Sequence, residues 1–200
     1  MCGTIQESII AGLIINGTAL ALILTQRPKD IWLGCFLFVI GLMQWADAAL
    51  WYQKSEGIST DFVSRYAIPT ILALEPLVAY AGYVLYYKKR MPVIEIIYAA
   101  ALLHFMVMWI MTCADTTITT DGFLKWCDYD MSSISKIAYL AMLVFPFLFY
   151  PDPVTRGLII LCLIVPWLYN FNHEAFGSRW CHSVEISCIL LLFSKGDGWS

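Results

Sequence analysis

The stretch IWLGCFLFVIGLMQWADAALWY, residues 31–52, indicates the fold class of this chain. Asp47 is its one charged residue, and the stretch is as long as the roughly 20 helical residues that cross a hydrocarbon core about 30 Å thick. Its apolar residues are continuous rather than alternating, which favours a transmembrane helix over a strand of a β-barrel. The sequence therefore predicts an integral membrane protein of the all-α class.

The same pattern recurs along the chain and predicts seven transmembrane helices. The composition agrees, because 60% of the 200 residues are hydrophobic and 14% are charged, against about 25% charged in a soluble domain. The net charge of −3 gives no electrostatic footprint for a nucleic-acid partner. We expect one seven-helix transmembrane domain over residues 1–200, with spans at about 9–25, 31–52, 62–87, 92–113, 134–150, 154–171 and 178–194.

The distribution of lysine and arginine predicts the orientation. Basic residues gather in cytosolic loops, and the compact run Lys88-Lys89-Arg90 follows the third predicted span. Seven basic residues fall on its side of the membrane and five on the other. The seven are Arg27, Lys29, Lys88, Lys89, Arg90, Arg156 and Lys195, and the five are Lys54, Arg65, Lys125, Lys136 and Arg179. This places the N-terminus outside or in a lumen and the C-terminus in the cytosol.

The seven cysteines divide into two groups by depth. Cys35, Cys162 and Cys188 lie inside predicted spans and act as small apolar residues. The other four fall at the outer ends of predicted helices, where an oxidising compartment favours disulfides. We expect Cys2 to pair with Cys181 and Cys113 with Cys127, and four free thiols are the alternative.

Ionisable residues at membrane depth are the candidate site. Each costs a few kcal/mol on insertion scales, so it is kept away from lipid and is commonly functional. No lysine or arginine lies at that depth to neutralise the acids. The candidates for binding an ion or substrate are Asp47, Glu75, His104 and Glu185, with Gln44 and His182 as polar neighbours.

Local spacing indicates which of these groups share a helix face. Gln44, Asp47 and Trp51 recur at i, i+3 and i+7, which is one stripe of a helix. Pro76 follows Glu75 directly and frees a backbone carbonyl one turn earlier, a common way to build an ion site in transporters. The structural alternatives are a simple proline kink, and interhelical hydrogen bonding by Gln44 and Asn16.

Three functions fit these residues. The leading hypothesis is a transporter or channel for a proton, a metal ion or a small cationic solute, with the buried acids as binding groups and His104 as a titrating partner. The alternative is a metal-dependent lipid hydrolase with zinc held by ligands from His104, His182, Asp47 and Glu185. The third is a non-catalytic structural membrane protein. No cofactor is predicted otherwise, and retinal is excluded because the last span has no lysine at its middle.

Three short motifs carry a resemblance to a known group of proteins. They are Met1-Cys2, Met43-Gln44-x-x-Asp47-x-x-x-Trp51 and Trp180-Cys181. In these the chain resembles small uncharacterised multipass membrane proteins of large DNA viruses and some algae. The motifs cover a small part of the chain, and the remainder matches in helix count and length. The resemblance implies a multipass helical fold and a viral-like source, without an activity. The membrane (plasma membrane, host endomembrane or virion) and the oligomeric state stay open.

Overall fold

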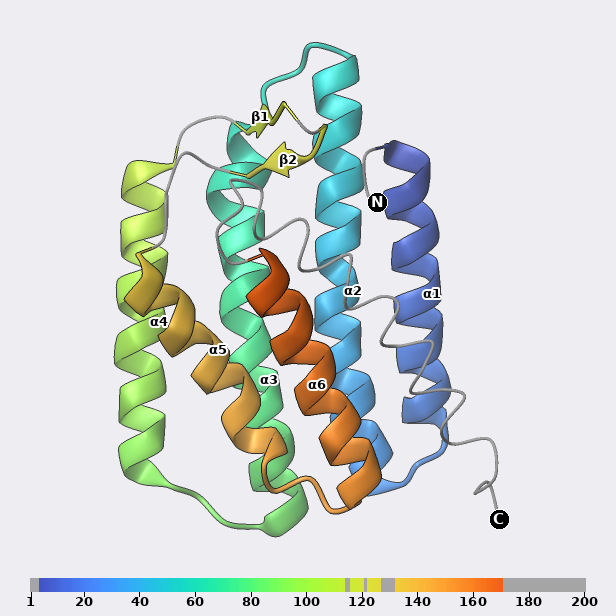
Figure 1. Cartoon of the computed structure of the whole chain (residues 1–200), viewed down its shortest axis with the longest axis vertical. Coiled ribbons are helices and arrows are strands. Elements are labelled where there is room, and N and C mark those ends of the chain that lie inside the picture. Colours follow the sequence, from blue (N-terminus) through green and yellow to red (C-terminus); the bar gives the residue numbers. More distant parts are fainter. Residues whose placement is uncertain (1–3, 114–115, 121, 127–131, 171–200) are drawn as a thin grey trace.

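The computed structural model describes residues 4–113, 116–120, 122–126 and 132–170. These form six α-helices, a short π-helix labelled η1 and one two-stranded antiparallel hairpin (Figure 1). In chain order the elements are α1 (Ile5–Leu24), α2 (Pro28–Ser55), η1 (Val63–Ala67), α3 (Ile68–Tyr87), α4 (Pro92–Thr112), β1 (Thr117–Ile118), β2 (Leu124–Lys125), α5 (Ser133–Phe147) and α6 (Pro153–Asn170).

Four of these helices are long and apolar enough to cross a membrane: α1, α2, α4 and the continuous segment Val63–Tyr87 that joins η1 to α3. This confirms a helical membrane protein at the level of class. Helices α5 and α6 are apolar but shorter, and the 15 residues of α5 rise only about 22 Å. The first six predicted spans each overlap a described helical segment, the third of them covering η1 and α3 together, and the seventh, 178–194, lies outside the described residues.

Consecutive helices run up and down beside one another. Helix α1 packs on α2, α2 on α3, α3 on both α4 and α5, and α5 on α6. In Figure 1, α5 and α6 lie in front of the row formed by α2, α3 and α4, and the hairpin lies at the end of the bundle where α1 begins. We call this the hairpin end. Lys88-Lys89-Arg90 follow α3 at the opposite end, which we call the basic end.

Small residues and one asparagine join α1 to α2. The Asn16 amide donates to the Phe38 carbonyl at 3.0 Å and accepts from Trp45 Nε1 at 2.9 Å. A Cβ atom on Gly41 would lie 2.6 Å from Asn16 Oδ1, so the glycine leaves room for the Asn16 amide between the two helices. The expected interhelical hydrogen bonding by Asn16 is therefore confirmed.

Three carbonyl groups that lose their regular helical partner to a proline are capped by aromatic side chains of another helix. Pro69, Pro76 and Pro146 have no backbone N–H to donate. The three pairs are the Ser64 carbonyl with Trp109 Nε1 (2.9 Å), the Leu72 carbonyl with the Tyr139 hydroxyl (2.9 Å) and the Met142 carbonyl with the Tyr98 hydroxyl (2.6 Å). Helix α4 or α5 thus restores a hydrogen bond at each break, as membrane burial requires.

An aromatic cluster closes the basic end around Trp32, which is 2% exposed. The rings in contact with Trp32 are those of Tyr83, Tyr86, Phe147 and Tyr150, with centroids 5.3–6.5 Å from its own. Gly82 of α3 makes the space for the indole, since a Cβ atom there would lie 1.8 Å from Trp32 Cδ1. The cluster therefore fixes α2, α3 and the end of α5 against one another.

Hydrogen bonds from loops reinforce the basic end. The Tyr150 hydroxyl donates to the Lys29 carbonyl at 3.1 Å. Arg90 Nε donates to Glu95 at 2.9 Å, and this hydrogen bond with the glutamate charge raises the pKa of the Arg90 guanidinium.

Candidate functional site

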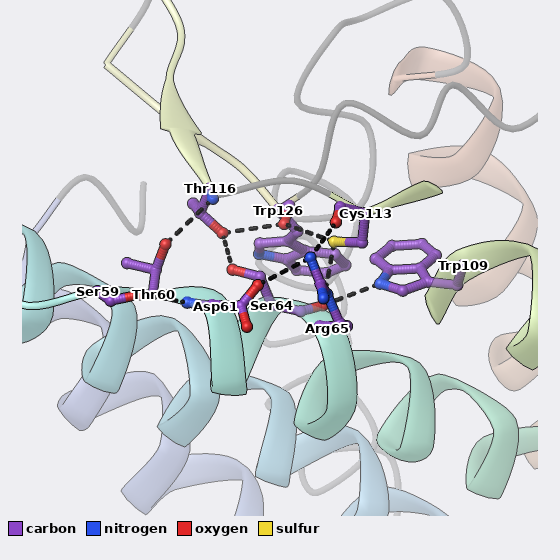
Figure 2. Close-up of polar contacts among 9 residues, drawn as sticks. All are labelled: Ser59, Thr60, Asp61, Ser64, Arg65, Trp109, Cys113, Thr116 and Trp126. Atoms are coloured by element: carbon purple, nitrogen blue, oxygen red, sulfur yellow. Dashed lines mark hydrogen bonds and ion pairs between the residues drawn. The ribbon is translucent and has the colours of Figure 1, made fainter. Parts of the chain in front are cut away.

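A network of buried polar groups occupies the hairpin end (Figure 2). Its centre is Thr116, which lies just before β1 and is fully buried. The Thr116 hydroxyl donates to the Trp126 carbonyl at 2.9 Å and hydrogen-bonds the hydroxyl of Ser64 in η1. Its backbone N–H donates to Thr60 Oγ1 at 3.2 Å. The hairpin is therefore attached to the start of the third membrane segment.

Arg65 extends the network to the end of α4. Its guanidinium donates to the Cys113 carbonyl at 3.0 Å and pairs with Asp61 at 3.1 Å. Cys113 is disulfide-bonded, and its sulfur lies 3.5 Å from the Ser64 carbonyl oxygen. Cys2, Cys127 and Cys181 lie outside the described residues, so the two predicted pairings stay predictions. Cys35, within α2, has a free thiol.

Asp47 of α2 joins this network through the side chain of Trp126. Its side chain is fully buried in α2, and Trp126 Nε1 donates to Asp47 Oδ1 at 2.5 Å. Gln44, one turn earlier on the same stripe, is also fully buried. The indole of Trp126 thus extends from the hairpin into the bundle, where it contacts Asp47 of the second predicted span.

Glu75 is the acid at the middle of the molecule. It lies twelve residues from each end of the segment Val63–Tyr87, about 18 Å along the helix, and its side chain is fully buried. The Tyr139 hydroxyl of α5 lies 2.7 Å from Glu75 Oε2. The other carboxyl oxygen, Oε1, has no hydrogen-bond partner among the described residues. Buried polar atoms without a partner are uncommon, and acids at membrane depth are commonly functional, so Glu75 is the strongest candidate among the described residues.

No protein-family model, curated protein or solved structure matches this chain.

The structure gives the candidate residues different surroundings. Asp47 and Glu75 are both buried, but Asp47 contacts the hairpin and Glu75 contacts α5. The His104 side chain is exposed on α4. His182 and Glu185 lie outside the described residues. Within the described ranges no three His, Cys, Asp or Glu side chains come together as metal ligands.

Sequence reasoning missed the groups that contact the two acids. The predicted spans end at 113 and resume at 134, which leaves the residues between them as a connecting loop. The structure contains the hairpin there, with Thr117 opposite Lys125 and Gly122 at a φ of 77°. The dipeptide Asp121-Gly122 is a hairpin signal that could have revealed the turn. No comparable signal identifies Tyr139 as the neighbour of Glu75, because the two residues are 64 positions apart.

Proposed function

We propose that this protein is a transporter or channel that moves protons across the membrane, with Glu75 as the group that binds and releases them. The observation that supports the proposal is the Glu75 carboxyl, fully buried at the centre of a long apolar helix, with one oxygen near Tyr139 and the other without a partner in the described part of the chain. Intramembrane carboxyls of this kind are the carriers of proton relays.

The surroundings of Glu75 favour a proton over a metal ion. A hard cation such as Ca²⁺ takes about six to eight oxygen ligands, and Mg²⁺ takes six. Among the described residues, the hydrogen-bond partner of Glu75 is a single phenol, the Tyr139 hydroxyl. A proton needs a single carboxylate. Among the cations that the sequence allows, we therefore propose H⁺ as the transported ion. We assign Asp47 a structural role, in which it holds the hairpin through its hydrogen bond with Trp126.

We also propose the seven-span topology with the hairpin end outside or lumenal. Two features at opposite ends of the bundle support this orientation. Cys113 is disulfide-bonded at the hairpin end, which suits an oxidising compartment, and Lys88-Lys89-Arg90 mark the basic end, which suits the cytosol. The likeness to proteins of large DNA viruses and algae stays a prediction.

Single introduced cysteines test the orientation. Thr120 in the hairpin turn and Lys89 after α3 are both exposed. A membrane-impermeant maleimide added to intact cells that expose the protein should label Thr120→Cys and should not label Lys89→Cys until the cells are permeabilised. Labelling of Lys89→Cys alone on intact cells would reverse the assignment.

Proton flux into liposomes tests the function. The purified protein is reconstituted with a pH-sensitive dye inside, and a potassium diffusion potential drives proton entry. We expect flux well above that of empty liposomes for the natural protein, and flux at the level of empty liposomes for Glu75→Gln. Glutamine keeps the shape of the side chain and an oxygen that accepts from Tyr139, but it cannot exchange a proton.

Glu95→Gln is the matched control, because Glu95 is an acid at the start of α4 that pairs with Arg90 rather than facing the bundle centre. Its flux should equal that of the natural protein. Equal thermal unfolding of the Glu75→Gln and natural proteins excludes misfolding as the reason for lost flux. Natural protein that conducts no better than empty liposomes, or Glu75→Gln that conducts normally, would refute the proposal.

A further inference from the structure

The Tyr139 hydroxyl lies between two acceptors. Its oxygen is 2.7 Å from Glu75 Oε2 and 2.9 Å from the Leu72 carbonyl oxygen. The Leu72 carbonyl needs a donor because Pro76, one turn later, has no N–H. A tyrosine hydroxyl has one proton, so it can donate fully to only one of the two oxygens. Which oxygen receives it depends on the state of Glu75.

When Glu75 is protonated, its O–H, the Tyr139 hydroxyl and the Leu72 carbonyl can all be hydrogen-bonded at once. The carboxylic O–H donates to the Tyr139 oxygen, and the Tyr139 proton is free to bond the Leu72 carbonyl. When Glu75 is ionised, the carboxylate is an acceptor only and forms the stronger, charge-assisted bond with the Tyr139 hydroxyl. The Leu72 carbonyl then loses its donor at the break in α3, and the link between α3 and α5 through Leu72 is released.

Within the described part of the chain, the other charged groups near α3 lie elsewhere. Helix α3 packs against α2, α4 and α5. On α2, Asp47 is bonded to Trp126 of the hairpin. On α4, His104 is exposed, and on α5, Lys136 lies in the first turn, near the hairpin end. The ring of Tyr139 is held against Phe105 of α4, with centroids 6.2 Å apart, which keeps its hydroxyl at the break.

We propose that Tyr139 is a positioning residue that couples the proton on Glu75 to the hydrogen bond across the Pro76 break, so that protonation ties α3 to α5 at Leu72 and deprotonation releases it. The inference rests on the proposed function only in requiring that Glu75 exchange a proton. It identifies the conformational change that proton binding would cause.

Two measurements on the reconstituted full chain test the coupling across a pH series. Infrared difference spectroscopy reads the C=O band of the protonated carboxyl that disappears in Glu75→Gln. Hydrogen–deuterium exchange reads the opening of residues 68–80. In the natural protein we expect exchange in this segment to increase about fivefold as the Glu75 band is lost, the factor expected for one net hydrogen bond.

Tyr139→Phe and Tyr98→Phe form a matched pair, since each removes one hydroxyl from a carbonyl freed by a proline. Tyr139→Phe should give exchange in residues 68–80 that is high at every pH, after normalisation for intrinsic amide exchange. Tyr98→Phe removes the cap on Met142, which has no recorded contact with Glu75, and should keep the pH-linked change in residues 68–80.

Exchange that stays constant while the Glu75 band disappears would overturn the inference, as would Tyr139→Phe that behaves like the natural protein. These outcomes are separate from the flux test. If proton flux depends on Glu75 but hydrogen–deuterium exchange does not follow the Glu75 band, the transporter proposal stands and the role of Tyr139 is refuted. If hydrogen–deuterium exchange changes with the Glu75 band but no proton flux is measured, the transporter proposal is refuted and the coupling through Tyr139 stands.

Discussion

Gly82→Ala should lower the free energy of unfolding by about 3–5 kcal/mol, as much as the loss of a buried aromatic side chain. The reason is steric, because the new Cβ atom would lie 1.8 Å from Trp32 Cδ1 and 2.4 Å from Trp32 Nε1. The indole must leave its place, and with it the contacts to Tyr83 and Phe147. Denaturant titration of the detergent-solubilised protein, followed by tryptophan fluorescence, measures the loss.

Gly17→Ala is the matched control for this prediction. It makes the same substitution inside α1, where no atom lies within 4 Å of the new Cβ, so stability should stay within about 1 kcal/mol of the natural value or rise. A second test combines Gly82→Ala with Trp32→Leu. The added alanine should cost far less in that background, because the clashing ring is gone. Equal losses in both backgrounds would show that Trp32 is not the cause.

Asp47→Ala should lower the free energy of unfolding by about 1–3 kcal/mol, because it leaves the buried Trp126 N–H without its carboxyl acceptor. Asp47→Asn should lose less, since an amide oxygen can accept the same hydrogen bond. The hairpin is expected to loosen in Asp47→Ala, so trypsin should cleave after Lys125 faster than in the natural protein. Unfolding titrations and cleavage rates together measure the effect.

Proton flux separates the two possible roles of Asp47. If Asp47 holds the hairpin, Asp47→Asn should conduct like the natural protein once its folded fraction is taken into account. Loss of flux in Asp47→Asn with normal stability and normal trypsin resistance would place Asp47 on the proton path, as the sequence hypothesis has it. Unchanged stability in Asp47→Ala would contradict the anchoring role.

The sequence predicts the helical membrane class well because that class depends on properties of continuous segments. Apolar length is a local quantity, and the charged turn at Arg27–Asp30 and the basic run after Tyr87 separate the helices. The π-helix Val63–Ala67, which opens the third predicted span, could not be predicted from the sequence. Its Ser64 forms tertiary hydrogen bonds with Trp109 of α4 and with Thr116, and such contacts depend on packing.

The candidate site was predictable in part. The cost of burying a carboxyl singles out Asp47 and Glu75 in the sequence, and both side chains are fully buried. Their neighbours Trp126 and Tyr139 could not be found in this way, because aromatic residues are common in membrane proteins and their partners are set by packing. His104 shows the same limit, since its exposure depends on how α4 is rotated.

The long separation between the acids and their partners has a consequence for biosynthesis. Asp47 precedes Trp126 by 79 residues, and Glu75 precedes Tyr139 by 64. At roughly 5–20 residues per second the ribosome makes the 79 residues in about 4–16 s. During that interval the second and third segments enter the bilayer with carboxyls that lack their eventual aromatic donors. These helices therefore insert before they reach their final packing. Chains truncated before residue 126 should be preferred substrates for membrane quality control.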